Sequence, residues 1–101
     1  MAISVHSRDF HSTETQPLAE MATLRMQAYF KRMINVSWTL VANHDEIVAR
    51  CEVHARSGRF FGAGRSPDMA VAIHEASDRI IRQRRRQKRM AERALPRVAV
   101  L

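Results

Sequence analysis

Residues 66–93, SPDMAVAIHEASDRIIRQRRRQKRMAER, combine the clearest helix signal in the chain with its densest positive charge. Ser66 can accept a hydrogen bond from the first free amides of a helix, Pro67 suits the first helical position, and Asp68 is favourable near the positive end of the helix dipole. Apolar side chains then recur at helical spacing: Met69, Ala72, Ile73, Ala76 and Ile80. The pattern predicts a long last helix with one buried face.

The basic part of this helix follows the apolar part. Residues 79–93 contain eight arginines or lysines against one acid. Without residues 79–97, the chain has eight basic and nine acidic residues, so the formal net charge of +7 is located in this region. The apolar stripe stops after Ile81, although no proline occurs before Pro96. We therefore expect the helix to extend beyond the sheet and to present its basic end without a core beneath it.

The rest of the chain predicts one helix and four strands. Alternating apolar and polar residues predict strands at 2–8, 34–40, 47–55 and 59–65. Residues 12–14 can start a helix, with Pro17 in its first turn, and this helix is expected to end near Arg32. Its predicted apolar face comprises Leu18, Met21, Ala22, Met26, Tyr29, Phe30 and Met33.

Each predicted strand has one apolar and one largely polar face, which indicates a sheet covered on one side only. The order β-α-β-β-β-α then predicts an α+β fold, with a four-stranded sheet and two helices packed on one face. At 101 residues the chain has room for one core. We expect residues 1–93 to form that domain and residues 94–101 to form a short flexible tail.

Composition and hydropathy indicate the cellular compartment of the protein. The mean hydropathy is −0.34, no apolar run is long enough to span a bilayer, and no secretory signal is evident at the N-terminus. The single cysteine cannot form an internal disulfide, which fits a reducing compartment. These features predict a cytoplasmic protein with no membrane partner.

A metal site or a catalytic site is the less favoured interpretation. The residues that suggest a metal are His44, Cys51, His54 and His74. Cys51 and His54 lie three apart on a predicted strand, so they point to opposite faces and cannot share an ion. Glu52 and His54 share a face, but arginines flank them, so an exposed strand surface explains them better than acid–base catalysis. We expect no enzyme activity, no cofactor, no metal and no small-molecule substrate.

Two other groups of residues have simple structural interpretations. Gly62 and Gly64 form no phosphate-binding loop, and we attribute them to tight packing near the neighbouring phenylalanines. Trp38 shares the apolar face of its strand and is expected in the core, whereas Phe61 could lie in the core or stack on a base.

The charge pattern favours a polyanionic partner. Like charges along one helix repel, and phosphate backbones are the commonest polyanion that neutralises such a run. Arginine outnumbers lysine fifteen to two, and its planar guanidinium both pairs with phosphate and stacks on bases. A solvated face, a membrane surface or an acidic protein partner are the alternatives.

The last helix also resembles a known family. The pattern Asp68-Met69-x-x-Ala72-Ile73, followed by Asp78-Arg79 and Arg82-Gln83, is similar to the last helix of the ribosome hibernation promoting factor family. That family is also called ribosome-associated inhibitor A, or the sigma-factor modulation protein family. The opening Ile3-x-Val5 with Arg8, the Phe30-x-Arg32 segment and Gly58 ahead of Phe60 have compatible spacings. The likeness spans roughly residues 2–90, and the sequence departs from the family at Ala70, Ala76 and Arg84.

The resemblance implies a fold like a double-stranded-RNA-binding domain with an added first strand. It also implies binding to the small ribosomal subunit between head and body, where the protein would block translation under stress by occupying the messenger and transfer RNA channel. The implied partner is the rRNA of that subunit, bound by a monomer, and the longer members' dimerisation domain is expected to be absent. The candidate rRNA-binding residues are Arg8, Arg25, Arg79, Arg82, Arg85, Arg86, Lys88 and Arg89. A regulatory module that binds an acidic partner of the transcription apparatus remains the alternative.

Overall fold

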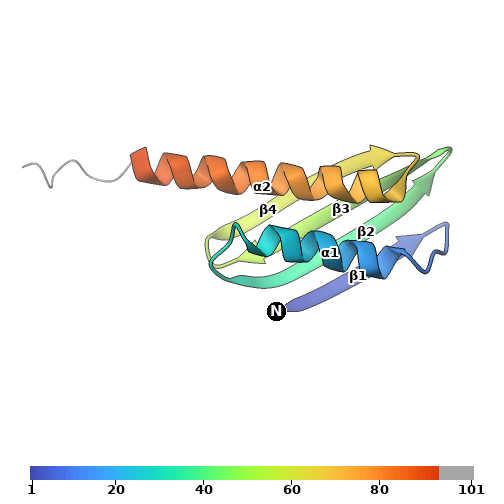
Figure 1. Cartoon of the computed structure of the whole chain (residues 1–101), viewed down its shortest axis with the longest axis horizontal. Helices are drawn as coiled ribbons and strands as arrows, with labels where there is room; N and C mark the ends of the chain where they lie inside the picture. Colours follow the sequence, from blue (N-terminus) through green and yellow to red (C-terminus); the bar gives the residue numbers. More distant parts are fainter. Residues whose placement is uncertain (94–101) are drawn as a thin grey trace, which may run out of the picture.

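The structure is a computed structural model that describes residues 1–93. Its elements are β1 Ala2–Arg8, α1 Thr15–Gln27, β2 Met33–Asn43, β3 Glu46–Ala55, β4 Gly58–Ser66 and α2 Met69–Arg93 (Figure 1). The predicted order β-α-β-β-β-α is confirmed. The tail predicted at 94–101 lies outside the described residues.

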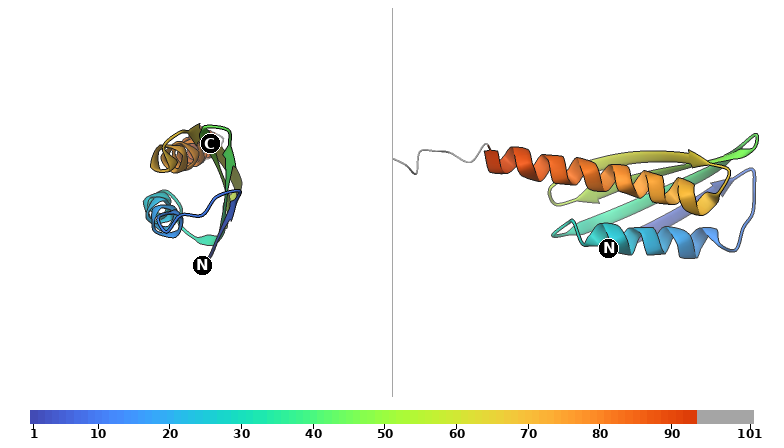
Figure 2. Two further views of the ribbon diagram at one scale, coloured as in Figure 1. Left: turned by 90° about the vertical axis from the view of Figure 1, so that its right-hand side faces the viewer. Right: turned by 45° about the horizontal axis from the view of Figure 1, so that its top comes forward.

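The four strands form one sheet in the order β1-β2-β3-β4. β1 runs parallel to β2, and the two remaining pairs are antiparallel. Both helices lie on the same side of the sheet, as the end-on view shows (Figure 2). The predicted α+β class and the one-sided cover are therefore confirmed, and the opposite face of the sheet is left open.

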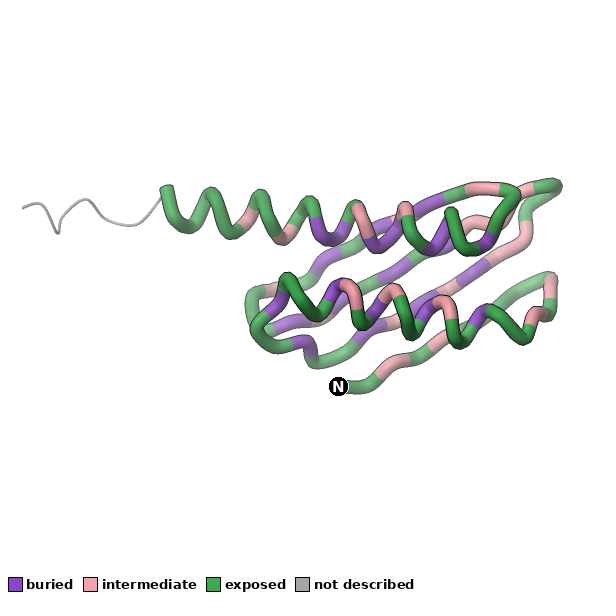
Figure 3. Tube along the Cα trace, viewed as in Figure 1, coloured by how far each residue is buried: buried purple, intermediate pink, exposed green. Residues whose placement is uncertain are grey.

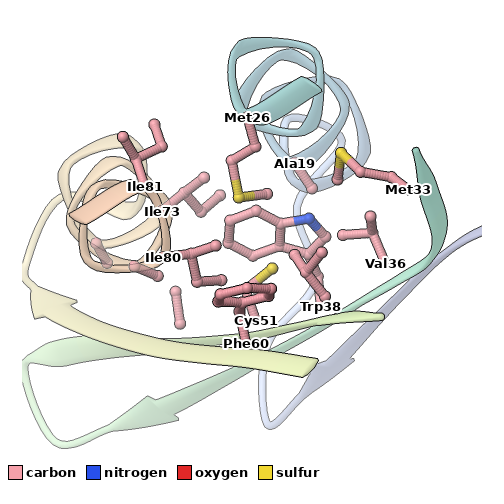
Figure 4. Close-up of a cluster of buried hydrophobic side chains, with 14 of the residues drawn as sticks. Ala19, Met26, Met33, Val36, Trp38, Cys51, Phe60, Ile73, Ile80 and Ile81 are labelled. Atoms are coloured by element: carbon pink, nitrogen blue, oxygen red, sulfur yellow. The ribbon is translucent and has the colours of Figure 1, made fainter. Parts of the chain in front are cut away.

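Trp38 lies at the centre of the core, between the sheet and the two helices (Figure 4). Its indole N–H donates to the Thr23 hydroxyl at 3.0 Å, and that hydroxyl donates to the Ala19 carbonyl at 2.8 Å. Because buried polar groups are costly unless paired, this chain of hydrogen bonds fixes how α1 sits on the sheet.

The apolar face predicted for the first helix is confirmed in part: Met26, Phe30 and Met33 are buried, and Leu18 and Ala22 pack partly buried against the core. The buried residues of α1 are Thr15, Ala19, Thr23 and Met26, whereas Met21 is 66% exposed. The prediction followed the larger apolar side chains and included Met26, but the helix also buries Ala19 and Thr23, whose hydroxyl accepts from the Trp38 indole. Apolar spacing alone could not reveal that hydrogen bond.

Two predicted boundaries near α1 also change. The helix ends at Gln27 instead of near Arg32, because the chain turns so that Phe30 can pack edge to face on Phe60, with ring centroids 5.0 Å apart. In β2, the pairing with β3 shifts between Met33 and Asn35, so Ile34 is 42% exposed instead of joining the core face.

α2 begins later than predicted. The amide N–H of Ala70 donates to Asp68 Oδ1 at 2.9 Å, so Asp68 is the N-cap and Pro67 precedes the helix. Ser66 still belongs to β4, and its hydroxyl accepts from the Asp68 amide at 3.1 Å. The predicted core stripe of the helix is confirmed, and Ser77 and Ile81 are also buried.

Gly62 and Gly64 allow α2 to lie directly against β4. A Cβ built at Gly62 would overlap the Ala76 carbonyl oxygen and lie 2.9 Å from Ile80 Cγ1. At Gly64 it would overlap the Ala72 carbonyl oxygen and lie 2.8 Å from Glu75 Cβ. The glycines are therefore required by the helix backbone, and not by the phenylalanines to which the sequence prediction attributed them.

Gly62→Ala should lower the free energy of unfolding by about 1–3 kcal/mol, because the added methyl group must push α2 away from β4. Urea denaturation measures the loss. Ala63→Ser is the matched control, since residue 63 lies between the two glycines and faces the other side of the sheet. Equal stability of G62A and the wild type would contradict this packing.

Candidate nucleic-acid interface

The basic half of α2 extends past the sheet, as the sequence predicted. From Arg82 to Arg93 no residue is buried, although the helix continues without a break (Figure 3). The exposed end lies beyond the sheet and beyond the C-terminal end of α1 (Figure 1). The arginines of this segment are therefore presented on a regular helix and not on a loop.

Four candidate side chains gather around a concave surface. A pocket of about 560 Å³ lies between the end of α1 and the basic half of α2. From α2 it is lined by Arg82, Arg84, Arg85, Lys88, Arg89 and Glu92. Ala28 and the 41% exposed Tyr29 line it from the chain after α1. The pocket thus offers several cations beside one aromatic ring, a combination suited to phosphate and base.

Two of the candidates on α2, Arg79 and Arg82, carry weak local partners. Arg79 pairs with Glu75 at 3.2 Å and Arg82 pairs with Asp78 at 2.9 Å, each one helical turn apart. Because exposed ion pairs of this kind contribute about 0.2–1 kcal/mol, they orient the guanidinium groups without preventing a phosphate from displacing the carboxylate. Arg86 is exposed on the same helix.

The remaining candidates, Arg25 and Arg8, lie apart from this group. Arg25 Nη2 donates to the Ser77 hydroxyl at 2.6 Å and to the His74 carbonyl at 3.3 Å, so its guanidinium ties α1 to α2. Arg8 ends β1 and lines a groove on the open face of the sheet. The structure therefore gathers the candidates of α2 along one helix and leaves these two elsewhere.

Three polar residues brace the start of the basic segment. Gln83 bonds both backbone groups of Phe61, accepting from its N–H at 3.3 Å and donating to its carbonyl at 2.6 Å. Gln87 donates to the Ser57 carbonyl at 2.8 Å. Arg84 Nε donates to the Tyr29 carbonyl at 3.1 Å, and its guanidinium lies 5.9 Å from the centre of the Phe30 ring. These contacts connect α2 to β4, to the β3–β4 turn and to the end of α1.

In the sequence, Arg84 is identified only as a departure from the family pattern. In the structure its guanidinium covers Phe30, an apolar role, and donates to a carbonyl just after the end of α1. The only sequence signal was its spacing of four residues from Ile80, which places it on the core stripe.

Arg84→Met should loosen the basic segment while keeping helix propensity and chain length. We expect a loss of about 1–2 kcal/mol from the hydrogen bond and the cation–π contact, and faster amide hydrogen exchange in residues 85–93. The matched control is Arg85→Met, which removes an exposed cation from the same helix. Identical exchange in the two variants would contradict the bracing role.

Cys51 and the neighbouring polar residues lie on opposite faces of β3. Cys51 is buried, and burial, with a smaller contribution from Glu52, raises the pKa of its thiol far above the ordinary value. Glu52 pairs with Arg59 at 3.8 Å on the open face. Within residues 1–93 no group of three His, Cys, Asp or Glu side chains could hold a metal ion.

The Cys51 thiol should resist alkylation in the folded protein near pH 8, because the reactive thiolate is disfavoured by burial. Its raised pKa stabilises the fold at lower pH, and this contribution declines as the pH rises above the pKa of the unfolded thiol. Labelling with iodoacetamide, with and without urea, tests this expectation. Equal labelling rates in both conditions would show that the thiol is accessible.

The fold and this surface define a small basic α+β domain suited to nucleic-acid binding. A family model described as "Sigma 54 modulation protein / S30EA ribosomal protein" matches residues 3–92. The chain therefore belongs to this family of ribosome-associated modulation proteins, which confirms the resemblance seen in the last helix.

Solved structures agree on the fold. The N-terminal domain of Thermus thermophilus Protein Y matches with a TM-score of 0.76 and 20% identity, over 85% of this chain and 98% of that chain. A ribosomal subunit interface protein from Coxiella burnetii matches with a TM-score of 0.78 and 17% identity, over 88% and 99% of the two chains. None of the curated proteins compared with the sequence gives a significant match.

Proposed function

We propose that this protein binds the small ribosomal subunit through the basic half of α2 and blocks translation under stress by occupying the messenger and transfer RNA channel. The observation that carries the proposal is the projecting helix: its arginines have no core to pack against and line a pocket with Tyr29. The family, together with the name of the similar structure from Coxiella burnetii, supports the ribosome as the partner.

Folded RNA fits this surface better than a small ligand does. Phosphate contacts position a protein but do not read sequence, so selectivity would come from the shape of the helix and of the cleft that receives it. The described residues offer a rigid cationic rod beside a compact body, which suits a cleft with phosphates on its walls. No catalytic step is needed, because occupancy alone excludes messenger and transfer RNA.

The proposal takes residues 1–93 as the ribosome-binding domain, acting as a monomer in the cytoplasm. No helix within residues 1–93 is long and apolar enough to cross a membrane.

Removing two of the exposed cations should weaken binding by a predictable amount. In the double variant Arg82→Gln/Arg86→Gln, two phosphate contacts are lost, so the slope of log K against log salt should become shallower by about 1.4–1.8. Affinity for purified small subunits at moderate salt should fall at least about ten-fold. Co-sedimentation at several salt concentrations measures both quantities.

A matched control carries the same net charge. Thr13→Glu with Asn43→Asp also lowers the net charge by two, but Thr13 precedes α1 and Asn43 ends β2, at the end of the molecule away from the basic helix (Figure 1). This variant should bind nearly as the wild type does. Equal losses in both variants would attribute the binding to net charge alone, and no association of the wild-type protein with subunits would favour the acidic protein partner.

A further inference from the structure

The open face of the sheet forms a second concave surface on the layer opposite the helices. A groove of about 240 Å³ crosses it, lined by residues from all four strands. Ser37 and Thr39 of β2 contribute hydroxyl groups, while Arg8 belongs to β1, Arg50 to β3 and Phe61 to β4. The groove therefore combines hydroxyl groups, two guanidinium groups and one aromatic ring, and Val41 and the carboxylate of Glu52 complete its lining.

Phe61 is unusual because its side chain is 56% exposed on a strand that is held firmly. Gln83 of α2 bonds both its N–H and its carbonyl, so the backbone that carries the ring is anchored from the other side of the sheet. The described residues leave more than half of Phe61 exposed. A large apolar side chain in this setting presents a pre-positioned flat face to a partner.

The cations on this face fall into two kinds. Arg59 pairs with Glu52 and Arg65 pairs with Glu46, each at 3.8 Å. Within the described residues, Arg8 and Arg50 have no ion pair of this kind and both line the groove.

The strand register sets the spacing of these groups. Arg50 is opposite Ala63, so it lies diagonally from Phe61, with Cβ atoms about 7–8 Å apart. Arg8 is opposite Val41, whereas Arg50 is opposite Thr39, so Arg8 lies two strands across and two residues along from Arg50, about 12 Å away. The Arg50 guanidinium can therefore reach a phosphate attached to a base that lies on the Phe61 ring, and Arg8 can reach a phosphate further along the same strand of RNA.

We propose that the open face is a second RNA-binding surface, on which an unpaired base stacks against Phe61 while Arg50 holds the adjoining phosphate and Arg8 a phosphate further along the strand. An aromatic ring on a sheet beside arginines is suited to single-stranded RNA, because every base offers a π face and every nucleotide a phosphate. The inference rests on the proposed function and adds that the domain contacts RNA from both of its layers.

A second copy of this chain fits the face poorly. In a symmetric pair, the arginines of one copy would approach the arginines of the other. One phenylalanine also supplies at most about 250 Å² of buried surface, whereas a stable dimer needs about 800 Å² from each partner.

Ring chemistry and charge can be tested separately with purified small subunits. Phe61→Leu keeps an apolar side chain without a π face and should bind about ten-fold more weakly, with an unchanged salt slope, whereas Phe61→Tyr should bind as the wild type does. Arg50→Gln should make the slope shallower by about 1. Thermal melting should be unchanged in F61L, because the ring packs on little else.

Two results would contradict the second surface, and they differ in what they imply for the α2 interface. Wild-type affinity in F61L together with an unchanged slope in R50Q would overturn the second surface while leaving the α2 interface intact. Failure of the wild-type protein itself to bind subunits would remove both proposals.

A tethered cleavage reagent tests whether the partner on this face is RNA. Ala63→Cys places a single reactive thiol on the open face, since native Cys51 is buried, and Met90→Cys places one on the exposed part of α2. An iron chelate attached at residue 63 should cleave nearby rRNA in the complex. Cleavage from residue 90 without cleavage from residue 63 would show that the open face meets solvent or a ribosomal protein.

Discussion

The contact between α2 and β4 is the constraint on which the rest of the structure depends. Two glycines on the strand let the backbone of the helix approach so closely that a methyl group would overlap a helix carbonyl. This proximity, with Ala72 and Ala76 facing the strand, sets the direction in which α2 leaves the sheet. The polar contacts of Gln83, Arg84 and Gln87 then hold that direction at the point where the core ends.

The basic end of α2 stays helical although its positive charges repel one another. Four pairs of like charges lie four residues apart between Arg82 and Arg93, and each costs about 0.2–0.5 kcal/mol, or about 1–2 kcal/mol together. The segment remains helical because it continues a helix that is already nucleated and packed. A polyanion that neutralises these arginines would remove the repulsion, so binding and helix stability should reinforce each other.

The sequence predicted the order of elements, the one-sided sheet and the projecting helix, because these follow from hydrophobic periodicity and from the distribution of charge. It misplaced part of the buried face of α1, since the burial of Thr23 in place of Met21 depends on a hydrogen bond to Trp38, fifteen residues away. The sequence could not show that Arg25 joins the two helices, unlike the exposed arginines of α2. Residue type alone does not say which groups an arginine will contact in the fold. The bracing role of Arg84 likewise depends on where Tyr29 and Phe30 lie after α1 ends.

The central claim is that the projecting half of α2 is the part of the molecule that meets ribosomal RNA. An electron cryomicroscopy structure of the protein bound to the small ribosomal subunit tests it most directly. The account predicts a continuous helix to about Arg93, with the guanidinium groups of residues 82–89 against the RNA backbone. Density that shows this segment unwound, or directed into solvent while another part of the domain holds the subunit, would contradict the account.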